Sequence, residues 1–491
     1  MARRSAALLL LPLLLIAGSA CFSMSSAPPE DPPPLPVAEG EGEGEGEGEG
    51  EGEGEGEGEG EGEGEGEGEG EGEGEGEGEG EGEGEGEVDL GWPFDDSVPA
   101  PCAPSDLDVP GGAPWNGWAN IQYPAQTSSA VGVESELLFG RVFQAGATEA
   151  PGQAPGFEAE LLVGPLGTTP LGDGRCWRAL PAQFNVQVGN DDEYRATVVP
   201  DAPGLFGLAF RFRPTGGVWR YGDRFGSDDG FDPLDLGVLS VPEAAATAPL
   251  KLVTLNLRCR ADDWVARKPL LVTALARIQP DLLALQEDCL TGDVTQAEEL
   301  IAELGTRTRR GYRFLRAGTH TANHTEGSFE EGVALLSAHP IEQSGVADLP
   351  FAMFPRKALW ADVTVRGVAL RYVATHLDYG ADADDERAAS AAQILTLATA
   401  GRALVVAGDM NSVPGSAAHA SFSSALVDLW ARANPSQAGL TYPAPNPSER
   451  IDYVFAPAAL ANGIAGARLL DESSGGVALS DHFGVAAALA P

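Results

Sequence analysis

An unbroken alternation of Glu and Gly over residues 39–87 constrains this chain more than any other feature of its sequence. The tract holds no apolar side chain, so it cannot bury enough surface to offset the entropy cost of ordering. Glycine keeps such a backbone flexible, and repulsion between the glutamates extends it. Pro-rich segments flank the tract. We therefore predict a disordered linker over residues 22–101, a solvated spacer rather than an ion-binding or partner-binding tail.

The same tract dominates the charge of the chain. The 491 residues carry a net charge of −45, and without the 25 acids of the tract the net charge is −20. No basic patch indicates tight, sequence-specific binding of nucleic acid. A nucleic acid held weakly enough to be released after reaction stays open as a substrate.

The first 21 residues have the pattern of an export signal. A basic pair precedes the apolar run 8–16, which is too short to span a membrane. Small residues directly before Cys21 resemble a bacterial lipobox, after which the cysteine is lipidated. Gly18 stands where Leu is usual, so ordinary signal-peptide cleavage is the alternative. We predict an exported protein, either a bacterial outer-membrane or cell-surface lipoprotein anchored at Cys21 or an extracellular protein.

Four cysteines remain if Cys21 is the anchor. An even number in an exported chain permits disulfides. Of the three pairings, we favour Cys102 with Cys176 and Cys259 with Cys289, because each bond then stays within one predicted domain.

Residues 102–245 contain short segments that alternate polar and apolar side chains, such as FEAELLVG and LFGLAFRFRP. Gly, Pro and Asn-Asp pairs separate them, and RPTGGVWRYGD is typical of a hairpin. This pattern predicts an all-β sandwich of immunoglobulin-like type. We find no acid pair, nucleophile or metal-ligand spacing in it, so we interpret it as an accessory module. Its tryptophans are expected to pack rather than line a ligand surface: Trp115, Trp118, Trp177 and Trp219.

Residues 250–491 alternate strand and helix patterns. The segments KLVTLNL, DLLALQE, GVALLS, ALWADVTV, ALRYVATH and ALVVAGD indicate strands. The segments VARKPLLVTALARIQP, TQAEELIAELG and DDERAASAAQILTLATA have helical spacing. A β-rich region with covering helices predicts an α/β or α+β domain with sheets in layers.

Several of these strands end in polar residues. Polar groups outside strand ends can converge on a ligand without unsettling the core. Carboxylates and amides suit a hard divalent cation (Mg²⁺, Mn²⁺ or Ca²⁺), whereas zinc would require more His or Cys. Each residue alone also has a structural explanation as a cap, a turn residue or a buried histidine. The residues are Asn256, Glu287, His376, Asp409, Asn411, Asp452, Asp481 and His482.

The pair Asp409-x-Asn411 follows the apolar run ALVVAG. If the chain stays extended, both side chains point to the same side. Gly408 allows a close backbone approach. Turn chemistry is the structural alternative, because turns also favour Asp and Asn.

The order of the motifs is more informative than any single residue. TLN, LQE, GVALLS with HPI, ATHLD, GDMNSVP, RIDYVF and LSDHFGV resemble the motif set of the endonuclease/exonuclease/phosphatase superfamily over residues 251–491. The resemblance implies an α+β fold, a four-layer α/β/β/α sandwich, and metal-dependent hydrolysis of P–O bonds. Two departures, His339 in place of Arg or Lys and Met410 in place of an aromatic residue, affect the expected substrate contacts.

The resemblance also implies roles at the cation and at the water. Glu287, Asn256 and Asp481 would hold the divalent cation, with Glu287 its main ligand. His482 would be the general base that takes a proton from the attacking water. Asp452 would orient that imidazole and stabilise its charged form.

Three further residues would act at the scissile phosphate. Asn411 would donate a hydrogen bond to it, and Asp409 would position the nucleophile or the leaving group. His376 would donate to a phosphate oxygen and stabilise the developing charge. Arg356 and Lys357 precede a strand and either reach a phosphate or form a solvated edge.

The predicted function is an exported, monomeric, Mg²⁺-dependent phosphodiesterase, with endonuclease activity favoured. A sphingomyelinase or a phospholipid or inositol-phosphate phosphoesterase is the alternative, and a catalytically silent surface-binding protein is more remote. Residues 251–491 hold 20 Lys plus Arg against 27 Asp plus Glu, which weakens the nuclease interpretation. No long apolar hairpin of the kind that a lipid-inserting enzyme would need is visible, and the nearest candidate, ADLPFAMFP, is short. His320 and His324, in a Gly- and Thr-rich loop, form a weaker candidate metal pair.

Overall fold

The computed structural model describes residues 97–490 apart from residues 106, 108–111, 228–229, 244–247 and 325. The predicted signal peptide, Cys21 and nearly all of the predicted linker lie outside the described residues. Within the described part, no helix combines the length and apolar character needed to cross a membrane. The domain boundary placed between residues 245 and 250 stays a prediction.

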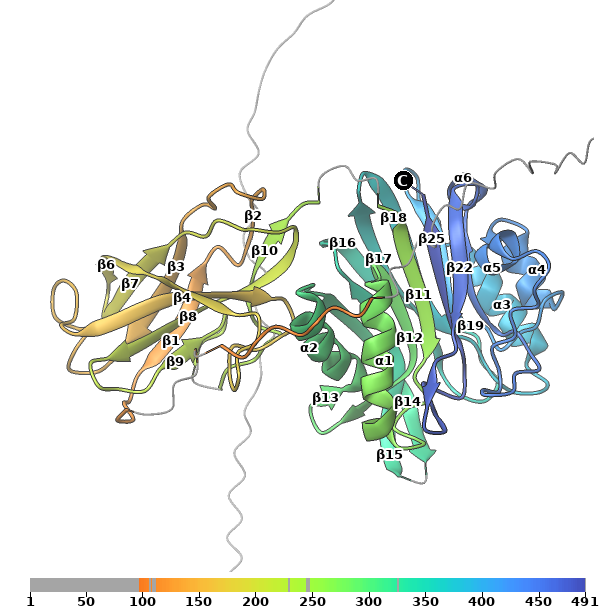
Figure 1. Cartoon of the computed structure of the whole chain (residues 1–491), viewed down its shortest axis with the longest axis horizontal. Coiled ribbons are helices and arrows are strands. Elements are labelled where there is room, and N and C mark those ends of the chain that lie inside the picture. Colours follow the sequence, from red (N-terminus) through yellow and green to blue (C-terminus); the bar gives the residue numbers. More distant parts are fainter. Residues whose placement is uncertain are drawn as a thin grey trace, which may run out of the picture. The chain divides into compact units, whose positions relative to one another are not determined.

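Residues 118–241 form two β-sheets, drawn from orange to yellow-green in Figure 1. The four-stranded sheet has the order β1 (Trp118–Tyr123), β3 (Leu138–Phe143), β7 (Asp191–Ala196), β6 (Gln183–Val188). The six-stranded sheet has the order β2 (Gln126–Ser128), β10 (Gly237–Val241), β8 (Gly204–Pro214), β4 (Phe157–Pro165), β5 (Arg178–Pro181), and β9 (Arg220–Gly222) pairs with β8. The β8–β9 pairing is the predicted hairpin.

Both sheets contribute side chains to one core. Leu138 and Tyr194 come from the four-stranded sheet, and Leu161 and Phe210 come from the six-stranded sheet. Full burial of such a side chain stabilises the fold by about 1.5–3 kcal/mol. Trp177 is also buried and donates from Nε1 to the Thr168 hydroxyl, as expected for a packing tryptophan.

Residues 250–489 contain two further large sheets, one of seven and one of six strands, and these are the two sheets meant from here on. The seven-stranded sheet has the order β14 (Arg313–His324), β15 (Gly327–Ser337), β12 (Leu282–Thr291), β11 (Leu250–Asn256), β25 (Gly484–Leu489), β22 (Ile464–Leu470), and β13 (Val294–Thr295) pairs with β12. The six-stranded sheet has the order β16 (Ile341–Leu349), β17 (Arg356–Val365), β18 (Val368–His376), β19 (Ala403–Asp409), β21 (Asp452–Ala456), β20 (Val427–Asp428). The short strands β23 (Ser473–Ser474) and β24 (Val477–Ala478) pair with each other.

These two sheets share a core that includes Leu252 of β11 and Tyr372 of β18. The helices α1 (Trp264–Ile278) and α2 (Gln296–Thr308) pack on the seven-stranded sheet. On the six-stranded sheet pack α3 (Asp384–Leu395) and α4 (Ala417–Ser423). Figure 1 shows the two helix pairs on opposite sides of the sheets. The remaining helices are α5 (Leu429–Ala433) and α6 (Ala458–Ala461). The mixed, sheet-rich α+β class is confirmed.

The helix ends follow from local sequence. Thr295 and Glu298 form a capping box at the start of α2, in which each side chain accepts from the other residue's backbone N–H. Asp263 caps the start of α1, which ends at Gln279 in the left-handed region directly before Pro280. The helix therefore ends before Pro280, the last residue of the predicted segment VARKPLLVTALARIQP.

Strand β14 corrects one prediction. His320 and His324 lie in this strand, not in a loop, and β14 pairs with β15 along its whole length. The segment alternates half-buried and exposed polar side chains, so it lacks the apolar alternation that identifies a strand in the sequence. Thr residues favour a pleated, half-buried surface and suit this position.

A buried cluster of charges surrounds Asp281, directly before β12. This fully buried carboxylate accepts from Arg366 at 3.0 Å and lies 2.8 Å from Nε2 of His339. Arg310 also donates to it. Burial alone would raise the pKa of Asp281, but these partners hold it well below its usual range.

We predict that Asp281→Ala lowers the free energy of unfolding by about 3–5 kcal/mol, because it leaves buried cations without their partner. The contribution of Asp281 should be complete above the unfolded-state pKa of about 3.9 and disappear as the pH falls below it. Urea unfolding at neutral and acidic pH measures both effects. Asp348→Ala, at a highly exposed carboxylate, is the control and should change little. Equal losses in both variants would contradict the prediction.

Candidate active site

Two parallel neighbouring strands bring the first predicted cation ligands together. Asn256 ends β11 and Glu287 lies in β12, and the Asn256 Nδ2 donates to Glu287 Oε1 at 2.9 Å. The pairing of β12 with β15 shifts register between Leu285 and Asp288, so Glu287 lies in an irregularity with φ 53°. Such bulges redirect side chains next to active sites. Here the bulge places Glu287 against Asn256.

The register of the six-stranded sheet aligns three other predicted residues. His376 of β18 is the direct partner of Asp409 of β19, and Asp409 is the direct partner of Asp452 of β21. His482 precedes β25 and so comes from the other sheet. Backbone pairing therefore places His376, Asp409 and Asp452 side by side at the ends of three neighbouring strands.

These groups converge on one atom, Asp409 Oδ2. Asn256 Nδ2 donates to it at 3.2 Å, and the Nε2 atoms of His376 and His482 lie 3.5 and 3.7 Å away. Asp409 is buried. Burial, reinforced by the charge of Asp452, raises the pKa of Asp409 to about 7. The charge of His482 acts in the opposite direction and lowers this pKa.

His482 forms an acid–base pair with Asp452. Its Nδ1 lies 2.9 Å from Asp452 Oδ2, and both side chains are buried. Burial disfavours the imidazolium, but the charges of Asp452 and Asp409 outweigh it and raise the pKa of His482 to about 10. With Nδ1 held, Nε2 is the atom that can exchange a proton with a water.

His376 is held in the opposite protonation state. Burial, and then the charge of Arg356, lowers the pKa of His376 well below its usual value. Arg356 donates to Nδ1 at 3.1 Å, so the proton of the neutral ring lies on Nε2. That N–H faces Asp409 and can donate to an oxygen placed there.

Asn411 reaches the site by a turn rather than by an extended strand. β19 ends at Asp409, and Asn411 has φ 46° in the left-handed region. Its backbone N–H donates to Asp409 Oδ1 at 2.9 Å and its Nδ2 donates to the Leu377 carbonyl at 3.0 Å. The chain is therefore not extended between Asp409 and Asn411, and the turn that was the alternative is observed; both residues line the same cavity.

Asp481 lies at the edge of the same cavity and is ion-paired to Arg258. Arg258 follows Asn256 by two residues, and its backbone N–H donates to Asn256 Oδ1 at 2.8 Å. Glu287 and Asp481 both line the cavity, and the Asn256 amide lies against Glu287. Carboxylate oxygens such as these suit a divalent cation of the Mg²⁺, Mn²⁺ or Ca²⁺ type.

The cavity has a volume of about 800 Å³ and all the predicted site residues except Asn256 and Asp452 line it. Sequence reasoning missed two charged residues at this centre, Arg258 and Glu331. Glu331 is buried on β15, and burial with the nearby charge of Glu287 raises its pKa to about 8. Its only sequence signal was an acid at the start of the apolar run GVALLS.

Other predicted contacts fall elsewhere. His339 binds Asp281, and Met410 is buried in the core under α3 and α4, so the two departures from the family pattern do not line the cavity. Arg356 is buried against His376 and lines the cavity. Lys357 instead lies 3.9 Å from Asp348.

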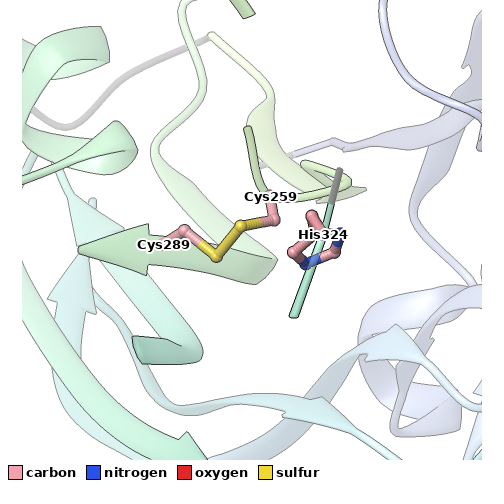
Figure 2. Close-up of side chains that lie close together, drawn as sticks. All are labelled: Cys259, Cys289 and His324. Atoms are coloured by element: carbon pink, nitrogen blue, oxygen red, sulfur yellow. A yellow bond between two sulfur atoms is a disulfide. The ribbon is translucent and has the colours of Figure 1, made fainter. Parts of the chain in front are cut away.

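The favoured disulfides are confirmed: Cys102 is bonded to Cys176, and Cys259 to Cys289. Figure 2 shows the second bond with His324 beside it. Because both sulfurs are bonded to each other, this group offers no thiolate ligands to a metal. The bond instead joins the segments that follow Asn256 and Glu287.

We predict that Cys259→Ser/Cys289→Ser lowers the free energy of unfolding by about 3 kcal/mol, since the bond closes a loop of 30 residues. The comparison is made in a Cys102→Ser/Cys176→Ser background, so that only this bond differs. Denaturant unfolding should give the same loss when the bond is reduced. An unchanged midpoint would refute the stabilising role.

Comparison with known proteins identifies the family. The sequence profile of the Endonuclease/Exonuclease/phosphatase family matches residues 253–482. These residues form an endonuclease/exonuclease/phosphatase domain. All eight predicted site residues lie within it. Members of this family are phosphoester hydrolases that generally use divalent metal ions, so the match supports hydrolase chemistry for this domain.

Solved structures similar to the endonuclease/exonuclease/phosphatase domain include a family protein from Leptotrichia buccalis, with 20% identity over 49% of this chain and 99% of that chain, at a TM-score of 0.43. The human Nocturnin catalytic domain with bound sulfate has 19% identity over 49% of this chain and 92% of that chain, at 0.40. A mannosyl-6-phosphatase from Bacteroides thetaiotaomicron has 18% identity over 48% of this chain and 98% of that chain, at a TM-score of 0.38. No curated protein matches the chain.

Proposed function

We propose that residues 250–491 form a metal-dependent phosphodiesterase, an endonuclease, that hydrolyses P–O bonds with water activated by the His482–Asp452 pair. The observation that carries this proposal is the convergence of Asn256, His376 and His482 on Asp409 Oδ2. A purely structural cluster has no need for two imidazoles held in opposite protonation states beside one carboxylate.

The proposed cation ligands are Glu287, Asn256 and Asp481, and Mg²⁺ is the proposed ion, with Mn²⁺ or Ca²⁺ as alternatives. A bound divalent cation would neutralise phosphate oxygens and stabilise charge on the leaving alkoxide. Arg258 already neutralises Asp481 in the structure. Binding of a cation therefore competes with this guanidinium for one carboxylate.

Side chains of the protein carry out the proton transfer and hold the phosphate. His482 takes the proton of the attacking water through Nε2, and Asp452 fixes the ring and balances the charge that the ring gains. His376 donates from Nε2 to a phosphate oxygen. Asp409 lies between these imidazoles and positions the water or leaving group. Asn411 donates a hydrogen bond to the scissile phosphate, and its backbone N–H also donates to Asp409.

A second candidate, phospholipid or sphingomyelin hydrolysis, is favoured by one observation. The side chains of Phe351 and Met353, in the stretch ADLPFAMFP, are about half exposed between β16 and β17. They lie in sequence beside Arg356, which lines the cavity. We place this candidate second because the apolar stretch is short.

A direct assay separates these substrates. Purified protein is offered plasmid DNA, sphingomyelin and phosphatidylinositol phosphates with Mg²⁺, beside an EDTA control and His482→Ala. We expect cleavage of DNA that EDTA and the variant abolish. Activity that survives both controls would overturn the mechanism, and turnover of a lipid alone would establish the second candidate. No turnover of any phosphoester would leave a catalytically silent binding protein.

The raised pKa of His482 predicts the pH dependence. The base must be neutral, so kcat/KM should rise from neutral to alkaline pH as His482 loses its proton. Asp452→Asn removes a negative charge that stabilises the imidazolium, so the pKa of His482 falls and the rising limb moves to lower pH. The plateau should fall as well, because the ring loses its orienting acceptor. A pH profile of both proteins tests this, and an unshifted limb would contradict it.

We further propose that the protein is exported and acts as a monomer, anchored at Cys21 or released outside the cell. Two disulfides support an oxidising compartment. The shared cores support a four-layer α/β/β/α order for residues 250–491 and an immunoglobulin-like sandwich for residues 102–245. Mass spectrometry of the mature N-terminus tests the anchor.

A further inference from the structure

Three aromatic rings from separate segments stack at one wall of the active-site cavity. His320 lies on β14, Phe354 precedes β17, and Tyr379 follows β18. The rings of His320 and Phe354 have centroids 4.3 Å apart at 16°, and those of Phe354 and Tyr379 are 5.9 Å apart at 23°. We call these three side chains the aromatic shelf. All three line the cavity that holds the catalytic centre.

Arg356 connects the aromatic shelf to that centre. Its guanidinium carbon lies 5.8 Å from the centroid of the Tyr379 ring, and its Nη1 donates to His376 Nδ1 at 3.1 Å. His376 in turn faces Asp409. Arg356 therefore lies between the aromatic shelf and His376, which is the proposed phosphate contact. A substrate whose planar group is attached to its phosphodiester could contact both at once.

The shelf is held in place by the buried carboxylate of Asp378. Its Oδ2 accepts from the backbone N–H groups of Ala352 and Met353, and its Oδ1 accepts from Gly380, all at 2.8 Å. Arg387 donates to the carbonyls of Asp378 and Gly380. These bonds tie the segment of Phe354 to the segment of Tyr379. Pre-ordered rings cost little entropy when a ligand binds.

The chemistry of the shelf selects an uncharged planar group. Burial, and then the charge of Arg356, lowers the pKa of His320, so its ring is neutral at pH 7. Tyr379 is 51% exposed and its side chain lines the cavity. Arg356 lies beside Tyr379 and 3.8 Å from Glu331. Its positive charge disfavours a cationic headgroup such as choline next to the Tyr379 ring, although aromatic rings alone would attract one. An uncharged base attached to an anionic phosphodiester suits both features.

We propose that the aromatic shelf binds a nucleobase next to the scissile phosphate of single-stranded nucleic acid. This inference rests on the proposed phosphodiesterase function and names its substrate class. A single strand suits the shelf better than a duplex, because bases in a duplex are already stacked on their neighbours. Stacking of a base on an aromatic side chain is worth about 1–3 kcal/mol, which corresponds to about fivefold to 150-fold in affinity.

The test compares two single-stranded oligodeoxynucleotides of equal length, one with bases and one abasic throughout. Binding is measured by fluorescence anisotropy in EDTA, and kcat/KM is measured with Mg²⁺. We expect wild-type protein to prefer the base-bearing strand by about fivefold or more. Tyr379→Ala should lose this preference and leave the abasic strand unaffected. Tyr379→Phe should keep it, because the ring remains.

Phe225→Ala, at an exposed aromatic residue of residues 118–241, is the matched control and should behave as wild type. Equal binding of the two strands by wild-type protein, or an equal loss on both strands in Tyr379→Ala, would overturn the shelf. Loss of binding to sphingomyelin vesicles in Tyr379→Ala with unchanged oligonucleotide binding would assign it to lipid instead. Base-dependent binding without hydrolysis would refute the proposed catalysis and leave the shelf standing.

Discussion

Replacing His482 with alanine should lower kcat by about a thousandfold or more on whichever phosphodiester the wild-type protein hydrolyses. The imidazole is the one group at the centre whose Nδ1 is fixed by a carboxylate and whose Nε2 faces Asp409. Without it the attacking water has no base, whereas substrate contacts through His376 and Arg356 remain. KM should therefore change much less than kcat.

Two controls sharpen this result. Imidazole added to the buffer should restore part of the activity of His482→Ala, because it replaces the missing group in a cavity of about 800 Å³. His419→Ala removes a histidine of the same domain that lies near Asp428 and outside the cavity. It should keep kcat. A similar loss of kcat in both variants would point to a folding defect rather than to a lost base.

Glu287→Gln should raise the Mg²⁺ concentration that gives half-maximal activity by about a hundredfold or more, because it removes a full negative charge from the donor set. The amide keeps nearly the same shape and can still accept from Asn256, so the fold should be unaffected. Titration of activity with Mg²⁺, and binding of Mn²⁺ measured directly, give two independent readouts.

The matched control is Glu330→Gln, a change of the same kind at an exposed side chain of β15, where Glu330 pairs with Arg316. It should leave the Mg²⁺ titration of the wild-type protein unchanged. An unaltered half-maximal concentration in Glu287→Gln would remove Glu287 from the proposed ligand set. An increase in both variants would indicate a general effect of charge.

The long apolar strands were predictable from the sequence. A strand that is buried on both faces has apolar residues at successive positions, which appear in the sequence as a continuous apolar run. The segments around Leu252, Val373 and Val405 are such runs, and each is a central strand in the structure. β14 was not predictable, since it lies at a sheet edge and its last part has exposed Thr and Asn side chains alternating with half-buried His. Its pairing with β15 depends on the partner strand, which local sequence does not report.

The candidate site divides in the same way. Polar residues at the ends of strands could be identified one by one, and the pairing of β18, β19 and β21 aligns His376, Asp409 and Asp452. The left-handed turn at Asn411 and the bulge at Glu287 depend on local backbone geometry that side-chain types do not specify. The aromatic shelf and Glu331 depend on contacts between segments far apart in sequence.

The bond between Asn256 and Asp409 joins residues of different sheets, and the Tyr372 hydroxyl likewise donates across to the Val253 carbonyl at 2.8 Å. The reactive centre thus lies between the two sheets. Each sheet keeps its own backbone hydrogen bonds if the sheets move apart. A small parting separates the catalytic groups long before either sheet melts. On gradual heating, turnover should therefore cease while circular dichroism still reports intact strands. The loss of activity would then measure the stability of the contact between the two sheets.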